Sequence, residues 1–458
     1  MPTSLAVVYP SSCSYPGFSG LSNKGEHVGL LQLIVLIGAF LFFAVLGLPI
    51  FISMGLSSAV YCTIFWNSSS FTTIPLEIIN FLNNFAFLAI PFYFLAGDLM
   101  NAGGITRRLV DFSTAIIGHI RGGLSHVNII ASMVFSGVSG SAVADTSAIG
   151  SVLIPAMIKE GYTASYAAAV TATSSTIGPV IPPSIPLVMY ALLTEESVGK
   201  LFLGGAIPGT LMGLYLLATS YLISKRRNYP SHPRVPLKQM AKAFIDAGLA
   251  LMMPIIIIGG IVSGMVTPTE AGALAVAYAL VLSLFFYREI NIKDIPRLFA
   301  KSMLSSANVM AIIASAGIFS YLVAEMRAGE VILQLFTSFS QSRWVILCII
   351  NIFFLLWGFV LDPMTAMVVI VPMLMPLIRA VGIDPVHFGV IVTVNLMIAL
   401  VTPPVGYLLY LSATISGARF EDVVKESYPF LIALLVTLIC VTFIPDLTLW
   451  LPQILMGK

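Results

Sequence analysis

The chain consists of long apolar runs separated by short polar or helix-breaking stretches. Runs such as 30–47, 201–223 and 428–445 approach or exceed the roughly 18 apolar residues that span a bilayer. We therefore predict an all-α polytopic membrane protein. Counting each proline-broken pair of helices once, the ten predicted crossings are 30–47, 50–66, 79–100, the broken pair 163–194, 201–224, 243–264, 270–287, 302–323, the broken pair 384–415, and 428–450.

Two stretches of this pattern, 221 positions apart, carry the same helix-breaking residues in the same register. The matched pairs are Gly137 with Gly358, Pro155 with Pro376, Gly161 with Gly382, and Pro182-Pro183 with Pro403-Pro404. Each stretch also contains an interrupted apolar segment, 123–160 and 343–380, which we predict to be a re-entrant helical hairpin. Broken apolar segments at matching positions of two halves indicate the substrate site of a secondary transporter.

Composition supports a membrane protein and excludes several other classes. The 458 residues are 58% hydrophobic and 9% charged, with a mean hydropathy of +0.99, whereas soluble domains carry about 25% charged residues. The formal charge of +2 and the absence of a basic stripe argue against a nucleic-acid partner. Neither metal-ligand spacing of histidines nor a nucleotide-binding or hydrolase motif occurs. We expect no enzyme, and any uphill transport must use an ion gradient or a separate ATPase chain.

Lysines and arginines gather in four loop regions, and basic loops stay in the cytoplasm. All four clusters lie on one side only if both termini are outside and each re-entrant segment enters and leaves by the same face. Each half then has five crossings, so the two halves are inverted relative to each other. The clusters are Arg107, Arg108 and Arg121; Lys225, Arg226, Arg227, Arg234, Lys238 and Lys242; Arg288, Lys293, Arg297 and Lys301; and Arg419 with Lys425.

Four half-helix starts fall inside the two repeated stretches, after Ser141, Pro183, Asp362 and Pro404. Free N–H groups at helix starts suit a carboxylate, and carbonyls left unpaired at the breaks suit a desolvated Na⁺. We therefore predict that a carboxylate solute and Na⁺ bind at these breaks. The surrounding oxygen-bearing or small residues are Ser136, Ser139, Ser141, Thr173, Ser174, Ser175 and Gly178 in the first stretch, and Gly358, Asp362, Thr365, Asn395 and Thr402 in the second.

Structural roles stay open for several of these residues. Serine and threonine in membrane helices often only bond a backbone carbonyl. Asp362 could be a helix cap, a site residue or both, whereas Asp145, in an apolar run, favours a functional role. Asp98 is placed near a predicted helix end, where we expect an interfacial side chain.

The motifs GVSGSAVADTSAIG, GPVIPPS, LDPMTA and TPPVG resemble those of the large membrane subunit of tripartite ATP-independent periplasmic (TRAP) transporters, including those of the sialic acid type, over roughly residues 29–450. The resemblance implies an inner-membrane elevator transporter, driven by Na⁺, that works with a small four-helix subunit and an extracytoplasmic binding protein. It implies one Na⁺ between Ser139–Ser141 and Gly178, and a second between Asp362 with its neighbours and the break near Thr402. The predicted substrate residues are Ser141, Asp145, Pro183, Ser184, Asp362 and Pro404.

The expected domains follow from this elevator arrangement. They are a polar tail 1–28; scaffold helices and an amphipathic arm 29–122; a transport hairpin and broken helix 123–195; scaffold helices 196–342 with a basic cytoplasmic loop 225–242; a second transport hairpin and broken helix 343–417; and a C-terminal scaffold helix 418–458. The predicted solute is a sialic acid or a dicarboxylate. Two alternatives are a stand-alone Na⁺/divalent-anion symporter and a passive channel or membrane anchor.

Overall fold

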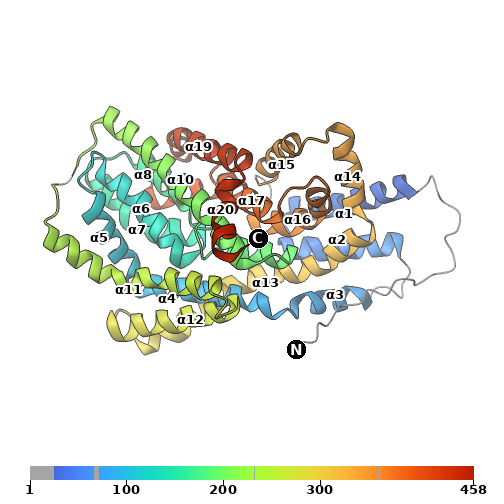
Figure 1. Ribbon diagram of the computed structural model, residues 1–458, viewed down its shortest axis with the longest axis horizontal. Helices are drawn as coiled ribbons and strands as arrows, with labels where there is room; N and C mark the ends of the chain where they lie inside the picture. The colour runs from blue at the N-terminus through green and yellow to red at the C-terminus, as the bar shows by residue number, and fades with distance from the viewer. Residues whose placement is uncertain (1–24, 67–71, 232, 359–361, 458) are drawn as a thin grey trace.

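The structure is a computed structural model that describes residues 25–66, 72–231, 233–358 and 362–457, and the described part of the chain is helical throughout (Figure 1). The predicted polar tail lies outside these residues up to position 24, and helix α1 already begins at Gly25. Residues 359–361, which belong to the predicted tip of the second hairpin, are also outside the described residues.

The first half contains ten α-helices and one short 3₁₀ turn among the described residues. They are α1 (Gly25–Val45), α2 (Ile50–Phe65), α3 (Thr73–Leu82), η2 (Phe85–Leu88), α4 (Ala89–Ala102), α5 (Ile105–Ile117), α6 (Gly123–Ser139), α7 (Ala142–Lys159), α8 (Ala164–Ser175), α9 (Ile185–Thr194) and α10 (Val198–Arg227).

The second half continues the all-helical pattern. Its elements are α11 (Leu237–Val262), α12 (Pro268–Val281), η3 (Leu282–Phe286), η4 (Ile292–Asp294), α13 (Ile295–Glu325), α14 (Ala328–Phe339), α15 (Arg343–Trp357), α16 (Pro363–Ala380), α17 (Pro385–Ala399), α18 (Tyr407–Ser416), α19 (Phe420–Phe443) and α20 (Asp446–Met456).

Eight helical segments of the described chain are long and apolar enough to cross a membrane, which confirms a multi-pass membrane protein. Six coincide with predicted crossings, and the other two, α7 and α16, are the second arms of the predicted hairpins. The remaining predicted crossings correspond to shorter apolar helices. The six are Phe85–Ala102, Val198–Arg227, Leu237–Val262, Pro268–Phe286, Ile292–Glu325 and Phe420–Phe443.

Several helix boundaries differ from the sequence prediction for local reasons. The predicted crossing 79–100 is interrupted because the side chain of Asn84 accepts a hydrogen bond from the Ala86 N–H and starts a new turn. The crossing 428–450 ends at Phe443, since the residue before Pro445 is disfavoured in a helix. The basic loop 225–242 is shorter than predicted, because α10 continues to Arg227 and α11 starts at Leu237.

The helices of the two stretches keep the spacing of 221 positions that the sequence shows. Helices α7 and α16 begin and end 221 positions apart, and so do the starts of α8 and α17. Gly161 and Gly382, which follow α7 and α16, both have positive φ (91° and 73°), and both Pro-Pro bonds are cis. Helix α6 ends at Ser139, because Gly140 (φ 59°) adopts the left-handed conformation that closes a helix.

The second arm of each predicted hairpin packs against both broken helices. Helix α7 packs against α6, α8 and α18, while α16 packs against α17, α14 and α9. The second half of each broken helix therefore contacts the hairpin of the other repeat. Helix α13 contacts α2, α3, α4 and α16 and runs through the middle of the molecule (Figure 1). This arrangement brings the breaks together beside α4 and α13.

Candidate functional site

A cavity of ≈ 800 Å³ lies where the four predicted half-helix starts meet. Residues at the starts of α7, α9, α16 and α18 line it together with residues of α4 and α13. Helix starts present N–H groups without intrahelical partners and a partial positive charge. From the four starts the lining residues are Ser141 to Ala144, Ile185 and Pro186, Asp362 to Met364, and Val405 to Tyr407.

Three of the four helix starts are capped by a side chain. Ser141 accepts a hydrogen bond from the Ala144 N–H (3.4 Å), and Ser184 accepts one from the Leu187 N–H (3.2 Å). Asp362 accepts from the N–H groups of Met364 (3.0 Å) and Thr365 (3.2 Å) and from the Thr365 hydroxyl. The fourth start, at α18, follows Gly406 and has no side-chain cap. Each capping oxygen still carries lone pairs that a cation or a solute donor can use.

Glycines allow the hairpin tips to approach the breaks closely. A Cβ on Gly140 would lie 2.7 Å from the Pro183 carbonyl oxygen, and one on Gly358 would lie 2.3 Å from the Ala399 Cβ. A Cβ on Gly178 would lie 3.7 Å from the carbonyl carbon of Ser141. The first tip is thus next to the first break, and the end of α15 is next to the second.

Buried polar pairs join α6 to α8 in the first repeat and α15 to α17 in the second, and their broken-helix members Ser174 and Asn395 occupy matched positions. In the first repeat the Ser174 hydroxyl donates to the Asn128 side-chain oxygen (3.1 Å). In the second, Asn395, 221 positions later, donates to the Asn351 side-chain oxygen (2.8 Å) and backbone carbonyl (3.0 Å). The Asn395 side-chain oxygen is buried and accepts no hydrogen bond from the described residues. A buried free oxygen of this kind is available to a cation.

Four of the predicted site residues, Ser139, Ser141, Gly358 and Asp362, line the cavity. Three hydroxyls among these residues donate to a backbone carbonyl four residues back, which is the structural role left open above. The predicted residues that do not line the cavity are Ser136, Asp145, Ser175, Gly178, Pro183, Ser184, Thr365, Asn395, Thr402 and Pro404; the three hydroxyls are those of Ser136, Ser175 and Thr402.

Asp145 is buried behind the cavity wall. The residue has no exposed surface, and neither carboxylate oxygen has a hydrogen-bond partner among the described residues. Asp145 belongs to the first turn of α7 but does not line the cavity, whereas its neighbours Ala144 and Ser147 do. It stays a predicted solute residue, but its contact with a solute would need a rearrangement.

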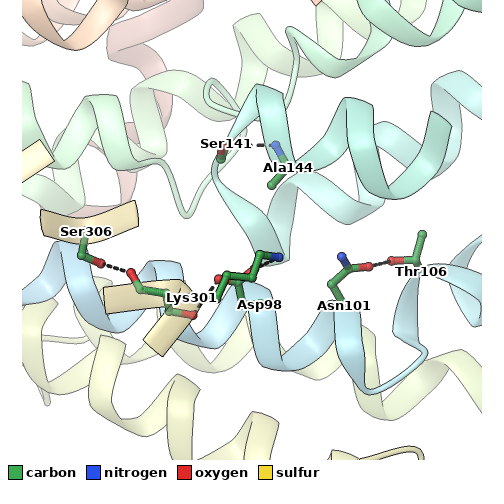
Figure 2. Close-up of polar contacts among 8 residues, drawn as sticks. Asp98, Asn101, Thr106, Ser141, Ala144, Lys301 and Ser306 are labelled. Atoms are coloured by element: carbon green, nitrogen blue, oxygen red, sulfur yellow. Dashed lines mark hydrogen bonds and ion pairs between the residues drawn. The ribbon is translucent and has the colours of Figure 1, made fainter. Parts of the chain in front are cut away.

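The cavity also contains polar side chains of α4 and α13 that the sequence analysis missed. Asp98, which was expected to be interfacial, lines the cavity, pairs with Lys301 (Nζ–Oδ1 3.1 Å) and accepts from the Ser302 hydroxyl (2.6 Å), as Figure 2 shows for Asp98 and Lys301. A helical spacing of four and three residues places Lys301, Ser305 and Asn308 on one face, and that spacing was the available signal. The missed residues are Asp98, Asn101, Lys301, Ser305 and Asn308.

Comparison with known proteins matches nearly the whole chain to one family of membrane transporters. A family model described as "Tripartite ATP-independent periplasmic transporter, DctM component" matches residues 37–447. The chain is 37% identical to the C4-dicarboxylate TRAP transporter large permease protein DctM of Pseudomonas aeruginosa, over 88% of this chain and 94% of that protein. It is 38% identical to the sialic acid TRAP transporter large permease protein SiaM of Vibrio cholerae, over 90% of this chain and 96% of that protein.

A longer relative and solved structures extend this comparison. The sialic acid TRAP transporter permease protein SiaT of Haemophilus influenzae is 35% identical over 95% of this chain, which corresponds to 69% of that protein. The crystal structure of the Alcanivorax borkumensis YdaH transporter matches with a TM-score of 0.60 and 14% identity, over 91% of this chain and 98% of that one. At this identity the structural likeness concerns the fold alone.

Proposed function

Because the chain belongs to the family of the DctM component of tripartite ATP-independent periplasmic transporters, we propose that it takes up an organic acid by Na⁺-coupled secondary transport. The relatives are transporter permeases, so the chain is a transporter subunit and not an enzyme. The observation that carries the proposal is the cavity on which four helix starts converge.

The charges of the cavity support a requirement for cations. Its described lining contains one basic residue, Lys301, and two acidic residues, Asp98 and Asp362. An acidic solute therefore meets an excess of negative side chains, which the partial positive charges of the helix starts only partly offset. Na⁺ bound beside the solute would reverse this balance, and this is a physical reason for coupling the two.

We place one Na⁺ between the first tip and the first break. Its proposed ligands are oxygens of Ser136, Ser139, Ser141, Ser175 and Gly178. The closeness of Gly178 to Ser141 supports this site, and hydroxyl and carbonyl oxygens are the ligands that a hard cation prefers.

The second Na⁺ belongs to the second repeat. Its proposed ligands are Gly358, Asp362, Thr365, Asn395 and Thr402. The carboxylate of Asp362 and the free side-chain oxygen of Asn395 support it. The two sites are chemically different, since the first has hydroxyls where the second has a carboxylate.

The solute in this proposal is a sialic acid or a dicarboxylate, two of the classes that the names of the relatives carry. Two partners complete the system: a small four-helix membrane subunit, and a periplasmic binding protein that delivers the acid. We further propose inverted repeats and an elevator motion in which the hairpins and broken helices move as one body. The packing of α7 with α18 and of α16 with α9 supports a single moving body.

Uptake by proteoliposomes tests this proposal. The chain is reconstituted with the small subunit, and the uptake of labelled succinate and N-acetylneuraminate is followed with and without an inward Na⁺ gradient and the binding protein. We expect saturable uptake that needs both. Uptake without the binding protein would favour the stand-alone symporter, and uptake that ignores the Na⁺ gradient would contradict coupling.

A further inference from the structure

The ion pair between Asp98 and Lys301 is part of the cavity wall, and its two members differ in accessibility. The side chain of Lys301 is 64% exposed, whereas that of Asp98 is 17% exposed. An incoming solute can therefore reach the ammonium group of Lys301 far more easily than the carboxylate of Asp98. In Figure 2 the two side chains point toward each other from α4 and α13.

Asp98 is held in place by more than the lysine. One carboxylate oxygen pairs with Lys301 at 3.1 Å, and the other accepts the Ser302 hydroxyl at 2.6 Å. If Lys301 leaves, Asp98 keeps the bond from Ser302. Lys301 has a flexible four-carbon stem and three donors, so it can turn from one carboxylate to another over a short distance.

Lys301 is also the one basic residue in the described lining of the cavity, and the other ionisable groups there are Asp98, Asp362 and Tyr407. Among these four, only the lysine attracts a carboxylate. The same cavity contains the starts of α7 and α16, where the proposed function places the Na⁺ and the solute.

We propose that Lys301 binds a carboxylate of the transported acid and that Asp98 occupies this lysine in the empty site, so that Asp98 competes with the solute. This inference rests on the function proposed above and names a specificity residue for it. Solute binding then exchanges one carboxylate for another on the same ammonium group. The competition lowers the affinity for the acid and assists its release.

Two variants that break the pair distinguish this proposal from a purely structural role, because they should change the affinity for the solute in opposite directions. Asp98→Asn removes the competing charge but keeps an oxygen that can accept the Ser302 hydroxyl. Lys301→Gln removes the charge that attracts the solute. If the pair only joined α4 to α13, both variants would weaken the protein and the site in the same direction.

The experiment measures equilibrium binding of labelled succinate and N-acetylneuraminate to the purified complex with the small subunit, at saturating Na⁺. We expect Asp98→Asn to bind the acid about two- to fivefold more tightly, because exposed ion pairs contribute little. Lys301→Gln should bind it about tenfold or more weakly, because a hydrogen bond to a charged group is lost. The double variant should behave like Lys301→Gln, and Lys301→Arg should retain binding.

A second ion pair provides the control. Glu289→Gln breaks the pair with Arg108 (3.2 Å), which lies outside this cavity, and should leave the affinity unchanged. Shifts of Asp98→Asn and Lys301→Gln in the same direction, or no shift in either, would overturn the inference while leaving the transport function intact. A wild type that binds neither acid would instead count against the proposed function, and the inference would fail with it.

Discussion

Asp362 and Asp384 form the same cap at two different helix starts, which allows the structural and functional parts of Asp362 to be separated. Each aspartate precedes a proline and accepts two backbone N–H groups: Asp362 at 3.0 and 3.2 Å, Asp384 at 2.8 and 3.2 Å. Both residues are exposed. Asp362 lines the cavity, whereas Asp384 lines a different and smaller one.

Replacement of either residue by alanine removes a cap, which costs about 1 kcal/mol of stability. We therefore expect similar losses of thermal stability for Asp362→Ala and Asp384→Ala. Asp362→Asn keeps an acceptor for the cap but removes the charge. If the carboxylate is a Na⁺ ligand, the loss of a charge-assisted contact of about 1.5–3 kcal/mol raises the Na⁺ concentration for half-maximal uptake about ten- to hundredfold.

The assay is Na⁺-dependent uptake in proteoliposomes at matched protein content, with thermal unfolding of each purified variant beside it. Asp384→Ala should lose stability and retain the wild-type Na⁺ dependence. Wild-type Na⁺ dependence in Asp362→Asn, or equal loss of uptake in the two alanine variants, would refute the assignment of Asp362.

Three further predictions concern the hairpins. Gly140→Ala should reduce uptake far more than Gly161→Ala, because both glycines have positive φ but only at Gly140 would a Cβ meet another chain segment, the Pro183 carbonyl at 2.7 Å; equal effects in the uptake assay would contradict this. Ser141→Ala should raise the half-maximal Na⁺ concentration about fivefold, since one hydroxyl contact contributes about 1 kcal/mol, and an unchanged Na⁺ titration would exclude Ser141 as a ligand. Single cysteines at Lys159 and Ala380, the exposed and matched ends of α7 and α16 away from the tips, should react with a membrane-impermeant reagent from opposite sides of the membrane; reaction of both from one side would argue against inverted repeats.

Local signals made much of this site predictable from the sequence. Helix breakers act on their immediate neighbours, and their identical spacing in two stretches predicted both hairpins and the meeting of four helix starts. The closeness of Gly178 to Ser141 agrees with what the family resemblance implied.

Long-range contacts were not predictable in this way. Asp98 and Lys301 are 203 positions apart, and only the packing of α4 against α13 brings them together. The burial of Asp145 was also not predictable from the sequence. This residue lies four positions after Ser141, but its side chain is fully buried and does not line the cavity. The break at Asn84 depends on a single side-chain hydrogen bond, which apolar periodicity does not reveal.

Coupling of acid uptake to Na⁺ entry can be measured by following the solute flux and the ion flux simultaneously. Proteoliposomes that contain the chain and its small subunit are supplied with loaded binding protein, and the entry of labelled acid and of radioactive sodium is followed in the same vesicles. If transport is coupled as proposed, every increment of acid is accompanied by a fixed number of Na⁺ ions, and Asp362→Asn lowers both fluxes together. Entry of the acid without any accompanying sodium flux would contradict this coupling.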